Sequence, residues 1–187
     1  RRNLNPIKLL TRIFIKKQRG PGRDFTSLKP SLRRIAFSLG VDHLGSDALD
    51  SLLSELSTFL GNMCTELVGL LSRINAQTIK FEHVIMVDPD IIKSGNKPCD
   101  TPLRKLKIGE KYYPECHFLT KAVVERKIRS KIGSYKLSAD ALDAMIDAAQ
   151  IRLVKVIESA GMITKNARRN TMNGGDVTVA LLAMSNC

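Results

Sequence analysis

Apolar side chains recur every three or four positions between Ser46 and Asn75, which places them on one face of a helix for roughly eight turns. Ser46 is a good N-cap residue, and Asp47 and Asp50 suit the positive end of the helix dipole. At about 1.5 Å per residue this helix is roughly 45 Å long, so it needs a partner along its whole apolar side. The expected core positions are Leu49, Leu52, Leu53, Leu56, Phe59, Leu60, Met63, Cys64, Leu67, Val68, Leu71 and Ile74.

A second stretch, Ser138 to Ala167, repeats this pattern. Shifting the sequence by 93 positions, from Thr78 to Thr171, superimposes the two stretches without a gap and places Asp47 on Asp140. The chain therefore contains an internal duplication of one supersecondary unit, with too few copies for a solenoid. The expected inward positions of the second helix are Leu142, Met145, Ile146, Ala149, Leu153, Val156, Ile157, Ala160 and Ile163.

Shorter helices flank each long one; a loop precedes each long helix, and a strand-like loop follows it. The expected short helices are Lys29 to Gly40 with Pro30 in its first turn, Lys80 to Val87, Phe118 to Ile132, and Asp176 to Met184. The chain thus divides into a basic arm (1–28), a first helical half (29–87), a basic connector (88–117) and a second half (118–187). Within the arm, Leu4 to Ile15 fits a short helix or a mobile segment equally well. The connector is either a DNA-contacting segment, which its charge density favours, or a solubilising linker.

Charge narrows the class of partner. The chain has 30 Lys and Arg against 18 Asp and Glu, for a net charge of +12. This excess favours a polyanion, nucleic acid first and an anionic membrane surface second, although a ribosomal-type or merely soluble basic protein is the simpler alternative. Trp is absent and Tyr and Phe are few, so contacts with backbone phosphates are favoured over base stacking.

Little in the sequence favours catalysis or a bound metal. The four cysteines form no CxxC pair, and we interpret them as reduced thiols of an intracellular protein. His43, His83 and His117 show no metal spacing, and we find no nucleophile, acid–base pair or phosphate-cradling glycine loop. We therefore expect no enzymatic activity, no metal and no cofactor, and we find neither a signal peptide nor a membrane-spanning segment.

The ordered elements and several short motifs resemble the histone fold. Lys29-Pro30-Ser31-Leu32-Arg33-Arg34, Phe59-Leu60-Gly61-Asn62 and Thr78-Ile79 resemble histone four, without gaps from Val41 to Ile85. Leu153-Val154 with Glu158, Ala167-Arg168-Arg169-Asn170-Thr171-Met172 and Asp176-Val177 resemble histone three, without gaps from Lys136 to Ala180. The whole chain resembles the fused histone doublets of large DNA viruses. This resemblance implies an all-α fold in which two tandem histone folds clasp each other as an intramolecular pseudo-heterodimer, the handshake.

The same resemblance implies where DNA binds. Paired loops and the N-terminal ends of the short first helices would contact phosphates where the minor groove faces the protein. None of these groups reads base identity, so binding is expected to be nearly independent of sequence. The candidate residues are Lys29, Arg33, Arg34, His43, Thr78, Ile79, Lys121, Lys127, Lys136, Arg168, Arg169 and Thr171.

The first half departs from histone four at positions that are basic in the family. His43 lies in its first loop, and an Arg–Asp pair of the family falls on Ala76 and His83. The second half keeps this pair as Arg169 and Asp176, which we interpret mainly as a structural ion pair. We therefore expect the first half to hold DNA less tightly than the second.

The resemblance also implies partners. These are double-stranded DNA, a second copy joined through Gly161 to Ala167 and Asp176 to Met184, and another doublet that resembles the two remaining core histones, in a virion and in a host nucleus or viral factory. The alternative is a histone-fold interaction module of a transcription or chromatin complex that binds DNA weakly. Five aspartates are expected on outer helix faces, as a solvated surface or as a weak docking patch: Asp47, Asp50, Asp140, Asp143 and Asp147.

Overall fold

A computed structural model describes residues 24–89, 91 and 118–185. The expectations for residues 4–15 and for most of the connector lie outside this part of the chain. Inside the segment that we assigned to the arm, Phe25–Leu28 forms a 3₁₀ turn (η1) that is capped by Asp24. Leu28 is completely buried, so the packed body already includes the end of that segment.

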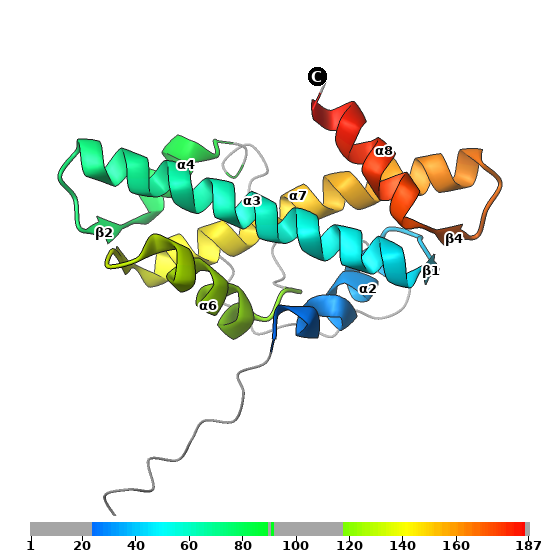
Figure 1. Ribbon diagram of the computed structural model, residues 1–187, viewed down its shortest axis with the longest axis horizontal. Coiled ribbons are helices and arrows are strands. Elements are labelled where there is room, and N and C mark those ends of the chain that lie inside the picture. Colours follow the sequence, from blue (N-terminus) through cyan, green and yellow to red (C-terminus); the bar gives the residue numbers. More distant parts are fainter. Residues whose placement is uncertain (1–23, 90, 92–117, 186–187) are drawn as a thin grey trace, which may run out of the picture.

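Both halves consist of a short helix, a long helix and a further helix, joined by loops that contain two-residue strands (Figure 1). The first half contains α2 (Lys29–Ser38), β1 (His43–Leu44), α3 (Ser46–Arg73), β2 (Thr78–Ile79) and α4 (Phe81–Val87). The second half contains α6 (Lys121–Ile132), β3 (Lys136–Leu137), α7 (Ala139–Asn166), β4 (Thr171–Met172) and α8 (Gly174–Ser185). These bounds confirm the predicted helical fold.

The duplication seen in the sequence extends to the backbone. Gly40 and Gly133, which are 93 positions apart, both have positive φ, at 76° and 62°. Asn75 and Arg168, also 93 positions apart, have φ of 54° and 53°. Positive φ is unusual for a residue with a side chain, so the shared bend after each long helix is a specific feature of the repeated unit.

The two halves pack against each other through the crossed helices α3 and α7, which run in opposite directions (Figure 1). α8 packs on α3 and α4 packs on α7, so each last helix contacts the long helix of the other half. Helices α2 and α6 lie along one side of the crossed pair, and α4 and α8 lie along the other (Figure 1). The apolar faces of the long helices therefore cover each other.

Most of the expected core positions are buried, including all nine of the second long helix except Ile163, which is half-buried. Burial of a leucine-sized side chain stabilises a fold by about 1.5–3 kcal/mol, so these rows are the main source of stability. Phe59 and Val68 are half-buried, and Ile74, at the C-cap of α3, is 50% exposed, contrary to prediction.

Helix α7 is buried on more sides than its pattern predicts. Asp147 is only 2% exposed, so its predicted place on an outer face is wrong. One turn further along, the side-chain oxygen of Gln150 accepts hydrogen bonds from the backbone N–H groups of Phe118 and Leu119. The segment that leads into α6 therefore covers this side of α7, and polar side chains there satisfy its backbone.

Several helix ends also differ from prediction. The N-cap of α3 is Gly45 rather than Ser46, whereas Ser138 caps α7 by accepting from the N–H of Ala141 at 3.2 Å. The helix expected from Phe118 begins at Lys121, because the N–H groups of Phe118 and Leu119 are bound to Gln150. The remaining differences are shifts of one or two residues: α4 begins at Phe81 and α8 at Gly174.

Candidate nucleic-acid interface

Two short parallel bridges join the loops of the two halves, one at each end of the crossed helices (Figure 1). In the β1–β4 bridge, His43 lies opposite Thr171 and Leu44 lies opposite Met172. The bridge is extended by the N–H of Gly45, which donates to the Met172 carbonyl at 2.9 Å. The structure thus brings together His43 and the loop that carries the predicted residues Arg168, Arg169 and Thr171.

The β2–β3 bridge pairs Thr78 with Lys136 and Ile79 with Leu137. The side chain of Lys136 is exposed, and that of Thr78 is half-buried. Ile79 is completely buried, so only its backbone is left for the DNA contact that the resemblance implies. Successive side chains of a strand point to opposite faces, so this bridge presents Thr78 outward and packs Ile79 into the core.

Helices α2 and α6, which carry the other predicted cations, lie between these two bridges (Figure 1), and Arg33 and Arg34 of α2 are exposed. Lys29 forms an ion pair with Asp50 at 2.6 Å, and Lys121 pairs with Asp143, the residue that the duplication places on Asp50. Exposed ion pairs contribute about 0–1 kcal/mol, so a phosphate could compete for either lysine.

Lys127 lies 5.3 Å from the centre of the Phe25 ring, which is a cation–π distance. This contact joins η1 to α6, and the two elements also pack together. The lysine therefore helps to attach the beginning of the first half to the second half, in addition to its predicted role at the surface.

Arg169 and Asp176 form the ion pair that the sequence predicts. Arg169 donates to Oδ2 of Asp176 at 3.1 Å and to Oδ1 at 2.5 Å, and Asp176 is only 3% exposed. Oδ2 also accepts from the Thr164 hydroxyl at 2.9 Å and from the Asn173 N–H at 3.0 Å. Burial alone would raise the pKa of Asp176, but these donors outweigh it and hold the pKa below its ordinary value. The network fixes the loop that carries Arg168, which is itself exposed.

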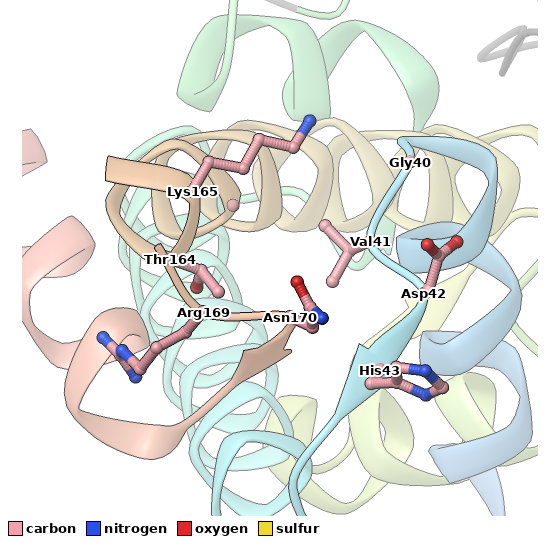
Figure 2. A pocket seen from close by; sticks show the side chains of 9 residues that line it. Gly40, Val41, Asp42, His43, Thr164, Lys165, Arg169 and Asn170 are labelled. Atoms are coloured by element: carbon pink, nitrogen blue, oxygen red, sulfur yellow. The ribbon is translucent and has the colours of Figure 1, made fainter. Parts of the chain in front are cut away.

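A pocket of about 280 Å³ lies beside the β1–β4 bridge, between the end of α2 and the end of α7 (Figure 2). Its charged groups have both signs, since Asp42 lies on one wall and Lys165 on the other. It is lined by Gly40, Val41, Asp42, His43, Gly161, Thr164, Lys165, Arg169 and Asn170. Among the described residues, no group of three or more His, Cys, Asp or Glu could hold a metal ion. The pocket therefore favours neither a metal nor one sign of ligand charge.

Two contacts between the halves were missed by sequence reasoning. The Asp47 carboxylate accepts from the N–H of Gly174 at 2.7 Å, which lowers the pKa of Asp47. Arg152 donates to Glu55 at 2.9 Å across the crossing of the long helices. The residue types alone do not indicate which residues pair, because the partners of each contact are about a hundred positions apart in the sequence. Predicting them would have required the crossing geometry.

Two further features of the residues that the structure describes are the thiol of Cys64 and the hydropathy of the helices. Cys64 is buried as predicted, and burial raises the pKa of its thiol to about 11. None of the described helices is long and apolar enough to span a membrane.

Comparison with known proteins supports the fold. No protein-family model and no curated protein matches the chain. Among the solved structures, the histone from Methanopyrus kandleri is similar, with a TM-score of 0.60 and 21% sequence identity. The match covers 81% of this chain and 91% of that chain. The chain therefore has a histone-like fold.

Proposed function

We propose that this protein binds and packages double-stranded DNA without sequence specificity, as a fused histone doublet. The first half stands for histone four and the second for histone three, and their pairing within one chain gives a pseudo-heterodimer. The similar histone chain supports this proposal, because a match over 81% of 187 residues is longer than either half. A connector that links the halves favours their pairing at any protein concentration, with an effective concentration on the order of mM.

The observation that carries the proposal is that exposed cations belong to α2 and to the loops that form the two bridges between the halves. Lys136 belongs to the β2–β3 bridge, Arg168 precedes β4 in the loop of the other bridge, and Arg33 and Arg34 belong to α2, a helix that lies between the two bridges (Figure 1). Phosphates bind well to such cations and to the N–H groups at helix starts, while the grooves need not be read. A net charge of +12 supports the same partner.

A second copy would join through the ends of α7 and α8. Met162, Val179 and Leu182 are 62%, 51% and 60% exposed, although all three are large and apolar. A group of exposed apolar side chains on neighbouring helices favours a protein contact, since burial removes them from water. We propose that a second doublet, resembling the other two core histones, flanks this pair. The particles would then resemble nucleosomes, in a virion and in a host nucleus or viral factory.

Nuclease digestion of the assembled complex tests packaging. We expect protected DNA fragments of discrete length, and a continuous smear would contradict the proposal. In binding experiments, log affinity should fall with log salt at about 0.9 per phosphate contacted. Lys136→Glu and Arg168→Glu should each weaken binding and reduce this slope, whereas Lys155→Glu on α7, away from the bridges and helix starts, is the matched control.

A histone-fold module that binds protein first and DNA weakly is the second candidate. One observation favours it, because Lys29, Lys121 and Arg169 all have carboxylate partners within the chain. This candidate predicts a shallow salt dependence and little effect of charge reversal at Lys136 or Arg168. The two functions are therefore separated by the same binding experiment.

A further inference from the structure

The crossing of α3 and α7 contains an ion pair that the duplication does not repeat. Arg152 donates to Glu55 at 2.9 Å, and the two side chains are only 31% and 14% exposed. The shift of 93 positions places Glu55 on Ala148 and Arg152 on Phe59. The two positions that correspond to this ion pair are therefore apolar: Ala148 is buried, and Phe59 is half-buried and packs against the core.

A second contact between the halves is also one-sided. Asp47, at the start of α3, accepts from the N–H of Gly174 at the start of α8. The corresponding residues are Asp140 and Phe81, and no such bond joins them in the part of the chain that the structure describes. A Cβ atom at Gly174 would lie 3.2 Å from Asp47 Oδ2 and 3.1 Å from Ser51 Oγ. A phenylalanine at that position would therefore crowd the carboxylate.

We infer that these two contacts select pairing of the first half with the second, and act against pairing of either half with its own kind. Two first halves would place Glu55 against Phe59, and two second halves would place Arg152 against Ala148. Each arrangement leaves a half-buried charge without its partner, which is unfavourable. Two first halves would also bring Asp47 against Phe81 instead of Gly174.

This selection matters because the halves are duplicated and joined in one chain. Pairing of like halves would have to occur between chains, and each chain would then leave its other half free to recruit another. Such open pairing produces polymers rather than closed units. The two contacts thus specify the partner, whereas the apolar faces supply most of the stability. The inference rests on the pseudo-heterodimer proposed above and not on DNA binding.

Charge exchange in the full chain tests the ion pair by chemical denaturation. Glu55→Arg and Arg152→Glu should each reduce the equilibrium constant for folding about tenfold, since like charges then face each other, and the double exchange should recover most of the loss. Exchange of Glu125 and Arg129, an ion pair within α6, is the control and should change the constant less than threefold. A double exchange that is no more stable than the single variants would overturn the inference.

A mixing experiment tests selection itself. An affinity-tagged Glu55→Arg chain and an untagged Arg152→Glu chain are unfolded and refolded together. In each variant, positions 55 and 152 carry the same charge, so position 55 of one chain meets an opposite charge only at position 152 of the other chain. We expect native mass spectrometry to find about tenfold more mixed complexes than for tagged and untagged wild type, a pair that also measures any association of whole chains.

The outcomes of mixing are decisive even where folding is impaired. If neither variant folds alone but the mixture regains helical circular dichroism, the inference is supported. If mixing yields no more mixed complexes than wild type, it is overturned. DNA is absent from both experiments, so a failure of DNA binding does not affect their result. Loss of pairing between the halves in the wild-type chain would instead contradict the proposed pseudo-heterodimer.

Discussion

The second loops of the two halves share a backbone bend but are fixed to the following helix by different chemistry. In the second half, Arg169 holds the loop to the buried carboxylate of Asp176. The corresponding residues of the first half are Ala76 and His83, and Nδ1 of His83 accepts from the N–H of Lys80 at 3.1 Å. The imidazole of His83 thus replaces the carboxylate as a helix cap, but Ala76 stands at the position of Arg169, so no side chain of the described loop is bound to it. Capping of the helix and clamping of the loop are therefore separable.

The largest effect is expected from removing the carboxylate of the clamp. Asp176→Ala leaves Arg169, the Thr164 hydroxyl and the Asn173 N–H without their acceptor, so it should lower the free energy of unfolding by about 2–4 kcal/mol. Urea denaturation measures this loss. His83→Ala, at the corresponding position, removes only a cap and should lower the free energy of unfolding by about 1 kcal/mol. Equal losses at the two positions would refute the comparison.

Acid should weaken the second half through the same group. The pKa of Asp176 is lowered in the folded state from an ordinary value of 3.8, so its contribution is complete above that pH. The contribution is lost as the pH falls through the lower folded value. We expect the Asp176→Asn chain to lose less stability than wild type between about pH 4 and pH 2, as measured by urea denaturation at each pH. Parallel profiles would argue against the clamp.

Transplanting the clamp sharpens the comparison. Ala76→Arg combined with His83→Asp should stabilise the first loop, with a favourable coupling of about 1 kcal/mol between the two substitutions in a double-mutant cycle. Each substitution alone should be neutral or destabilising, because it introduces a charge without the intended partner. Additive single effects would mean that the loop geometry of the two halves is less alike than their shared φ values indicate.

The smallest effect is expected from restoring a cation in the first loop. His43 lies exposed opposite Thr171 in the β1–β4 bridge. His43→Lys should add one phosphate contact and steepen the salt slope of DNA binding by about 0.9, with an affinity gain of a few-fold at low salt. His43→Gln is the matched control, and a gain in that variant as well would exclude an effect of charge.

Periodicity and duplication were sufficient to predict the helices, the shared register and most of the core. Leu67 and Val156, for example, are buried as predicted, because the apolar face of a long helix must be removed from water by packing against another element. The loop after each long helix was also recognised as strand-like, whereas the loops that contain β1 and β3 were expected to be plain loops; the pairing of β2 with β3 places Lys136 beside Thr78.

The rest depended on contacts between distant segments. Asp147 was expected on the surface because the spacing of α7 gives no sign that this side of the helix is covered as well, but it is only 2% exposed. Ile79 was assigned to the DNA surface by resemblance, whereas the pleat of its bridge turns it inward. Gly45 replaces a side-chain cap because a Cβ there would lie 2.4 Å from Asp47 Oδ1, and Asp47 is directed toward α8. That requirement arises only when the two halves meet.

The buried thiol of Cys64 on α3 can be used to measure how often the packed core of the protein opens. Its raised pKa, about 11, leaves little thiolate at neutral pH, and alkylating reagents react with the thiolate. Modification should therefore proceed only through transient opening of the core. In a chain whose other three cysteines are replaced by serine, the rate of labelling would report how often the protein opens, and bound DNA should slow that rate if it holds the two halves shut.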